Sequence, residues 1–170
     1  MALREILIFP DERLRAVSAE VAACDDELRT LVEDMFETMY ASGGIGLAAP
    51  QVGVRQRLVV IDVREEEGEQ DACRRALVNP RIVSAEGEVL SHEGCLSVPE
   101  YRAEVPRAER ITVEASDEHG QPLHFEAAGM TAICIQHELD HLEGRLFIDY
   151  LSRLKRERLL ARYTKLRERR

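Results

Sequence analysis

Two histidines and a glutamate in the stretch QHELDHLEG (136–144) have the spacing of a metal-dependent hydrolytic site. His137 and His141 are four residues apart, so on a helix both imidazoles lie on one face, about 6 Å apart along the axis. Glu138 stands beside the first histidine, where a carboxylate can act as a general base. Hydrolytic sites of this type usually take three protein ligands and leave one position for water. The sequence must therefore supply a third ligand.

The residues that follow this stretch do not complete the ligand set. In one large group of metalloproteases the H-E-x-x-H helix continues x-x-G-x-x-H, and the last histidine is the third ligand. Here Gly144 matches the glycine, but Phe147 stands at the ligand position, and a phenyl ring does not bind the metal. Thermolysin-type enzymes draw a glutamate from a later helix. The later glutamates Glu157 and Glu168 belong to a strongly basic segment, so we do not assign them this role.

Three other residues remain as candidates for the third ligand. Cys134 lies on the helix face of the histidines, but roughly 10 Å of helical rise separates it from His141, so we interpret it as a buried thiol. The segment SHEGCLSVPEYR (91–102) offers Cys95 and His92. A thiolate with two imidazoles is a known catalytic set for zinc and is plausible for ferrous iron. From the residues alone, both Cys95 and His92 stay open.

The stretch GGIGLAAPQVG (43–53) places glycines and alanines before Gln51. It is a poor match to a phosphate-binding loop, because it follows a predicted helix and has no Walker lysine. Its small residues instead indicate a bare backbone edge with which an extended peptide could pair. Gln51 adds a side-chain amide donor to this edge.

The periodicity of apolar residues predicts the elements that position these motifs. Asp25 and Asp26 are typical helix starters, and a 3.6-residue period follows them, so we expect a helix over about 26–42. A second helix, about 130–142, carries the histidines, and a basic helix starts near Ser152. Four strands are predicted, at RLVVID (57–62), ALVNPRIVS (76–84), ITVEAS (111–116) and LHFEAA (123–128). The segment DEHGQP (117–122) is predicted to be the turn between the last two strands, and REEEGEQDACRR (64–75) to be a polar loop. The pattern indicates an α+β fold, with antiparallel β-strands packed around a central H-E-x-x-H helix and a C-terminal helix.

Length and composition indicate a single domain without a membrane span. The chain has 170 residues, of which 45% are hydrophobic and 32% charged, and its apolar runs are too short to cross a bilayer. We expect residues 1–150 to form the catalytic metallohydrolase body and residues 151–170 a basic helix of the same domain. The four cysteines show no disulfide framework, and the N-terminal segment does not resemble a signal peptide. These features predict a cytoplasmic protein.

Charge is concentrated at the C-terminal end. Residues 151–170 carry a net charge of +7, which leaves −16 for the first 150 residues of a chain whose total is −9. An acidic body argues against broad nucleic-acid binding by the core. On the basic helix we expect one stripe that faces the body or a partner, formed by Leu151, Leu154, Leu159, Tyr163 and Leu166.

Three segments together resemble the motifs of a known family. In order and in spacing, they match the three motifs of the peptide deformylase family: G-I-G-L-A-A-P-Q (44–51), E-G-C-L-S (93–97) and H-E-L-D-H (137–141). The resemblance covers nearly the whole chain and is much more specific than H-E-x-x-H alone. It implies that Cys95 is the third metal ligand, together with His137 and His141.

The resemblance implies hydrolysis of the N-formyl group from the initiator methionine of new polypeptides, which releases formate. Glu138 would be the general base, and the Gln51 side chain and the Leu96 backbone N–H would stabilise the oxyanion. Asp140 would face away from the metal and make a supporting contact. Ligand softness fits zinc, whereas the resemblance implies ferrous iron (Fe2+) in the cell, with Zn2+, Ni2+ or Co2+ possible in the isolated protein.

The resemblance also implies substrate and partner contacts. The methionine side chain would enter a pocket formed by Ile45, Glu93, Met130, Ile133 and Cys134. Gly44, Gly46 and Gly94 would pair with the peptide backbone, and the basic helix of a monomeric enzyme would contact the ribosome near the exit tunnel. Two other classes remain as alternatives: a metallopeptidase that cuts internal bonds, and a metal-binding protein without activity. The presence of Glu138 and Gln51 disfavours the second.

Overall fold

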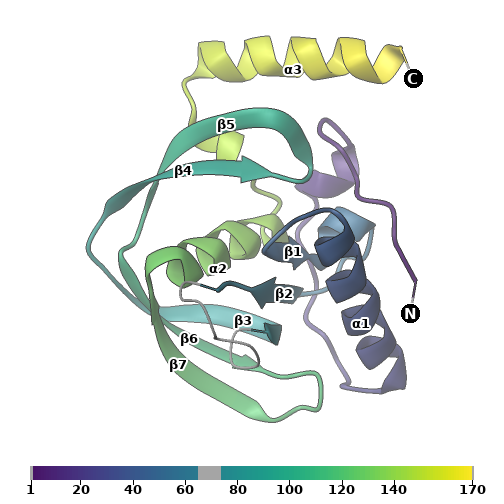
Figure 1. Ribbon diagram of the computed structural model, residues 1–170, viewed down its shortest axis with the longest axis vertical. Helices are drawn as coiled ribbons and strands as arrows, with labels where there is room; N and C mark the ends of the chain where they lie inside the picture. The colour runs from purple at the N-terminus through teal and green to yellow at the C-terminus, as the bar shows by residue number, and fades with distance from the viewer. Residues whose placement is uncertain (1, 65–73, 170) are drawn as a thin grey trace.

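A helix lies between two β-sheets, and another long helix crosses one end of the molecule (Figure 1). The computed structural model describes residues 2–64 and 74–169. The elements along the chain are η1 (Glu12–Arg15), α1 (Asp26–Ala41), β1 (Gly46–Ala48), η2 (Ala49–Val52), β2 (Leu58–Asp62), β3 (Arg74–Glu86), β4 (Val89–Cys95), β5 (Val98–Arg107), β6 (Arg110–Ser116), β7 (Pro122–Ala128), α2 (Gly129–Leu142), η3 (Phe147–Tyr150) and α3 (Arg153–Glu168). Within the two described ranges, no helix has the length and apolar character needed to cross a membrane. The α+β class predicted from the sequence is confirmed.

Helix α1 begins at a side-chain cap and closes one face of the larger sheet. The Asp25 carboxylate accepts a hydrogen bond from the Leu28 N–H at 2.9 Å, which satisfies one free amide of the first turn. Its buried apolar residues belong to the same core as β1 and β2: Leu28, Leu31, Val32, Met35, Phe36 and Met39. The helix predicted over 26–42 is confirmed and ends at Ala41.

The larger sheet has five antiparallel strands in the order β1-β2-β3-β6-β7. Alternate residues of β2 face opposite layers: Leu58 and Val60 pack with α1, and Val59 and Ile61 pack with α2. Because helices cover both faces, every residue of β2 is buried. All four predicted strands and the turn at 117–122 are confirmed. Strand β1 stands at the sheet edge, next to the candidate site.

A second sheet, the hairpin β4–β5, is not predicted from the sequence. Its antiparallel strands are joined by a tight turn at Leu96 and Ser97. Strand β4 has three polar residues in succession, Ser91, His92 and Glu93, and so lacks the alternation typical of a half-buried strand. Strand β5 does alternate, and this signal was overlooked. Arg74 and Arg75, predicted as the end of a polar loop, are instead the first residues of β3, because they extend its pairing with β2. The rest of that loop, 65–73, lies outside the described residues.

Helix α2 crosses between the two sheets, and α3 packs beyond the hairpin (Figure 1). The basic helix predicted from near Ser152 is confirmed: the Ser152 side chain caps α3. Leu159 and Tyr163 are buried, whereas Leu154 and Leu166 are 57% and 39% exposed. The predicted stripe is therefore wrong at Leu154, because the 100° turn per residue places Leu154 on the side of α3 opposite the two buried residues. Leu166 lies on the same side as Leu159 and Tyr163 but stays partly exposed.

Candidate metal centre

The hairpin β4–β5 brings Cys95 against the two histidines of α2. One side-chain atom each from Cys95, His137 and His141 forms a group whose members all lie within 4.8 Å of one another, and Cys95 Sγ is 3.4 Å from His141 Nε2. Tetrahedral coordination with usual metal–sulfur and metal–nitrogen bonds separates such atoms by roughly 3.6 Å, so this donor set fits a divalent transition metal. His92 lines the neighbouring cleft, but it is not a member of this group among the described residues.

The second ring nitrogen of His137 has a carboxylate partner. His137 Nδ1 lies 2.8 Å from Glu93 Oε1, and this contact leaves Nε2 facing Cys95 and His141. Such carboxylate contacts fix the tautomer and orientation of a metal-binding histidine. Burial lowers the pKa of His141 well below its usual range, which favours the neutral imidazole that binds metals.

Glu93 is itself held by a buried arginine that the sequence reasoning did not single out. Arg107 donates from Nε and Nη2 to the two Glu93 oxygens, both at 2.8 Å, and from Nη1 to Asp140 at 2.7 Å. Burial alone would raise the pKa of Glu93, but the hydrogen bonds from Arg107 and His137 outweigh burial and lower this pKa to about 2. Glu93 is therefore a carboxylate at neutral pH. In the sequence, Arg107 resembles any exposed strand arginine, so no signal distinguished it.

Glu138 lies at the base of the same site, and no ion pair joins its carboxylate to another side chain within residues 2–64 and 74–169. It is 5% exposed, and its Oε2 has no hydrogen-bond partner among the described residues. Burial raises the pKa of its carboxyl to about 7, although the charges of His137 and Arg107 act in the opposite direction. A carboxylate with a pKa near neutrality, aimed into a cleft, suits a general base.

Gln51 enters the site from η2, immediately after the edge strand. Its Oε1 accepts a hydrogen bond from the Ala48 N–H at 2.9 Å, which directs Nε2 towards the hairpin turn. There Nε2 donates to Ser97 Oγ at 3.1 Å and lies 3.7 Å from Cys95 Sγ. Leu96 occupies the turn between these two residues. Sequence reasoning missed Ser97, which orients the Gln51 amide.

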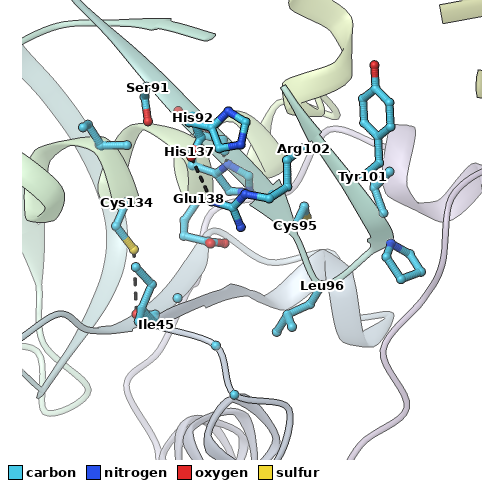
Figure 2. Close-up of a pocket in the computed structure, with 18 of the residues that line it drawn as sticks. Ile45, Ser91, His92, Cys95, Leu96, Tyr101, Arg102, Cys134, His137 and Glu138 are labelled. Carbon is cyan, nitrogen blue, oxygen red and sulfur yellow. Dashed lines mark hydrogen bonds and ion pairs between the residues drawn. The ribbon is translucent and has the colours of Figure 1, made fainter. Parts of the chain in front are cut away.

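A cleft of about 580 Å³ opens between β1, the hairpin and α2 (Figure 2). Its walls include all of the residues predicted to bind substrate: Gly44, Ile45, Gly46, Glu93, Gly94, Met130, Ile133 and Cys134. Figure 2 shows Cys134 and Ile45 on one side, where Cys134 Sγ lies 3.7 Å from the Ile45 carbonyl oxygen. Gln51, Cys95, Leu96, His137 and Glu138 border the same cleft. Reactive groups and a partly apolar cavity are thus adjacent.

Comparisons with known proteins agree with this arrangement. The profile of the polypeptide deformylase family matches residues 3–157. Curated peptide deformylases of Alkalilimnicola ehrlichii and Pseudoalteromonas translucida are 52% and 54% identical, over 98% and 97% of this chain and 92% and 96% of those proteins. A Legionella pneumophila peptide deformylase structure is similar with a TM-score of 0.88, at 48% identity over 99% of both chains. An Ehrlichia chaffeensis peptide deformylase in complex with actinonin gives 0.90, at 42% identity over 97% of this chain and 98% of that one. The chain belongs to the peptide deformylase family of metal-dependent hydrolases.

Proposed function

We propose that this protein removes the N-formyl group from the N-terminal formylmethionine of newly synthesised polypeptides and releases formate. The observation that carries this proposal is the group of half-buried Cys95 and buried His137 and His141 beside Glu138, at the base of a cleft bordered by an edge strand. A cleft of this size accommodates an extended peptide end with one apolar side chain.

Each site residue has a proposed role that follows from its chemistry. A divalent ion bound by Cys95, His137 and His141 would supply Lewis acidity and lower the pKa of a coordinated water molecule from about 15.7 towards roughly 7. Water attacks the formyl carbon, Glu138 accepts the proton of that water, and the same carboxyl delivers it to the amine as the C–N bond breaks. The products are formate and a free α-amine.

Two hydrogen-bond donors are proposed to stabilise the oxyanion that forms on the formyl oxygen. They are Gln51 Nε2, which already points towards Cys95, and the Leu96 backbone N–H in the hairpin turn. Removal of one such donor typically costs about 3 kcal/mol of transition-state stabilisation. Because Ser97 Oγ holds the Gln51 amide, the donor direction is set before substrate arrives.

Substrate is proposed to bind as an added strand. The backbone of Gly44 and Gly46 on one side, and of Gly94 on the other, would pair with the peptide main chain, while the methionine side chain enters the pocket beside Ile45 and Cys134. Main-chain pairing ignores side-chain identity beyond methionine, so one enzyme can serve many nascent chains.

A comparison of three substrates tests this function. The purified protein should hydrolyse a formyl-Met peptide with release of formate, and it should leave both the acetyl-Met analogue and the internal peptide bonds intact. A formyl group is smaller than an acetyl group and leaves the carbonyl carbon accessible in a confined site. Cleavage of internal bonds in preference to deformylation would instead identify a metallopeptidase.

The metal in the cell is proposed to be ferrous iron, with Zn2+, Ni2+ or Co2+ possible after isolation. The donor set fits any of these ions; ligand softness fits zinc, and the family resemblance supports ferrous iron. Anaerobic purification followed by metal analysis and a formyl-Met-peptide assay on the same sample tests the proposal. Stoichiometric iron that is lost in air together with activity is the expected result, and stoichiometric zinc in the active anaerobic sample would contradict it.

The basic helix α3 is proposed to bring a monomeric, cytoplasmic enzyme to the ribosome. Arg158, Lys165 and Arg169 are exposed. Arg158 and Lys165 lie on the side of α3 away from the buried Leu159 and Tyr163, and Arg169 is the C-cap residue of the helix. A cationic face on an otherwise acidic body suits attachment to RNA phosphates through counterion release. The body would then be held near emerging chains without broad nucleic-acid binding by its own surface.

A further inference from the structure

Arg107, the last residue of β5, is a buried arginine shared by two carboxylates. Its side chain is 3% exposed and forms ion pairs with Glu93 and Asp140. The two acids belong to different elements, since Glu93 is on β4 and Asp140 is on α2. The Tyr150 hydroxyl donates to the same Asp140 oxygen at 3.1 Å, and the guanidinium carbon lies 5.1 Å from the Tyr150 ring centre. Arg107 thus joins a strand, a helix and the segment after the helix.

Ala108, the residue after Arg107, forms two further hydrogen bonds with the same helix. The Ala108 N–H donates to Gln136 Oε1 at 2.8 Å, and Gln136 Nε2 donates back to the Ala108 carbonyl at 3.0 Å. Gln136 precedes His137 on α2, and Asp140 precedes His141. The end of β5 therefore holds α2 beside each of the two histidines.

This placement matters because the proposed metal ligands come from two separate elements. Cys95 lies at the end of β4, and both histidines lie on α2, so the position of the hairpin relative to the helix sets the distances among the three donor atoms. We propose that Arg107 is the positioning residue of the metal centre. It orients Glu93 towards His137 Nδ1, and it fixes α2 against the hairpin that carries Cys95.

The chemistry of the side chain explains why arginine is needed. Its planar fork donates to both Glu93 oxygens and, from its remaining nitrogen, to Asp140. The ammonium of lysine is a compact point charge and cannot reproduce this double contact. An Arg107→Lys variant therefore keeps the positive charge but should let Glu93 rotate and the helix shift.

The test compares Arg107→Lys with Arg57→Lys in the metal-loaded protein. Arg57 is the control, since it also ties the end of α2 to the sheet, through the C-cap residue Glu143 at 2.7 Å and the Pro80 carbonyl at 3.2 Å, but within the described ranges it contacts no proposed metal ligand. Arg107→Lys should speed metal loss to a chelator by about 10- to 100-fold, shift the visible spectrum of the cobalt-loaded protein, and lower kcat more than it changes KM. Arg57→Lys should leave the metal-loss rate and the spectrum unchanged.

A double-mutant cycle tests the path through Glu93. If Arg107 acts by orienting this carboxylate, Arg107→Lys combined with Glu93→Gln should lose metal no faster than the worse single variant. If the accelerations of metal loss in the two single variants multiply in the double variant, the proposal is overturned. It is also overturned if the Arg107→Lys protein has a lowered Tm but unchanged metal loss and spectrum. If Arg107→Lys fails to fold, Asp140→Ala removes one of the two contacts and should still accelerate metal loss. The inference rests on the proposed ligand roles, but these measurements need no peptide, so a failure of the deformylase assay is distinguishable.

Discussion

At the scale of single residues, the thiol of Cys95 and the imidazole of His92 are only three positions apart, but their environments differ. The Cys95 thiol lies beside the imidazole nitrogens of His137 and His141 on α2, whereas the His92 side chain lines the cleft wall. Cys95→Ser should therefore lose most of its metal, because a hydroxyl stays protonated at neutral pH whereas a thiol ionises when it binds a metal. Metal analysis after dialysis measures this loss. His92→Ala is the matched control and should retain stoichiometric metal; the reverse result would transfer the ligand role to His92.

The raised pKa of Glu138 leads to a prediction about pH. Burial raises the pKa of this carboxyl to about 7, and a general base must be deprotonated, so kcat/KM should rise as the pH increases through this pKa. A nearby divalent cation favours the carboxylate, so the rise should be centred below 7. Glu138→Gln should keep its metal, lose about 10²- to 10⁴-fold in kcat, and lack this acid limb. A pH profile that is flat up to neutrality would contradict the assignment.

At the scale of elements, the edge strand β1 lies so close to α2 that a Cβ atom at Gly46 would displace side chains of the helix. A Cβ atom on Gly46 would stand 2.7 Å from Cys134 Sγ and 2.8 Å from Glu138 Oε1. Gly46→Ala should therefore displace the Glu138 carboxylate and lower kcat at least 10-fold, with a loss of about 1–3 kcal/mol in the free energy of unfolding. Steady-state kinetics and denaturant unfolding check both effects.

A second substitution separates the effects of the steric clash with Cys134 from those of the clash with Glu138. Adding Cys134→Ala to Gly46→Ala removes the sulfur contact but keeps the contact with Glu138. Stability should partly return while kcat stays low. Full recovery of kcat in the double variant would show that the approach of β1 to Glu138 is unimportant for turnover.

At the scale of the whole molecule, the opposite charges of α3 and the body lead to a salt-dependent prediction. Changing Arg158, Lys165 and Arg169 to Gln removes three exposed charges and leaves the packed face of Leu159 and Tyr163 intact. Co-sedimentation with ribosomes should weaken, and the slope of log affinity against log salt should fall by about 3. Hydrolysis of a short formyl-Met peptide should stay within about two-fold, because the exposed face of α3 is remote from the proton-transfer groups.

The matched control removes the same number of charges from the body. Arg55, Arg81 and Arg110 are exposed and lie outside α3, so their replacement by Gln should leave co-sedimentation and its salt slope nearly unchanged. Equal losses in both triple variants would mean that net charge, and not the position of α3, determines attachment. Unchanged binding in the α3 variant would contradict the ribosome proposal.

The sequence by itself determined the elements whose signals are local. The 3.6-residue period after Asp25 and the β-branched run in β2 predict a helix and a strand, because each pattern reports which side of one element is apolar. The spacing of His137 and His141 likewise places two imidazoles on one helix face without any tertiary information. The three motifs together identified the family, since their residue types, order and spacing are jointly specific.

The tertiary structure decided what depends on contacts between distant segments. The β4 strand of the hairpin was missed because Ser91, His92 and Glu93 are consecutive polar residues, and the burial of Glu93 makes sense only when it is known to face a buried arginine. Arg107 was missed for the same reason, since a buried charge is recognised by its partners and not by its neighbours in sequence. Likewise, the residues alone left Cys95 and His92 open as the third ligand. The fold placed Cys95 Sγ at 3.4 Å from His141 Nε2 and His92 on the cleft wall, because the distance between side chains on different elements is set by packing and not by spacing along the chain.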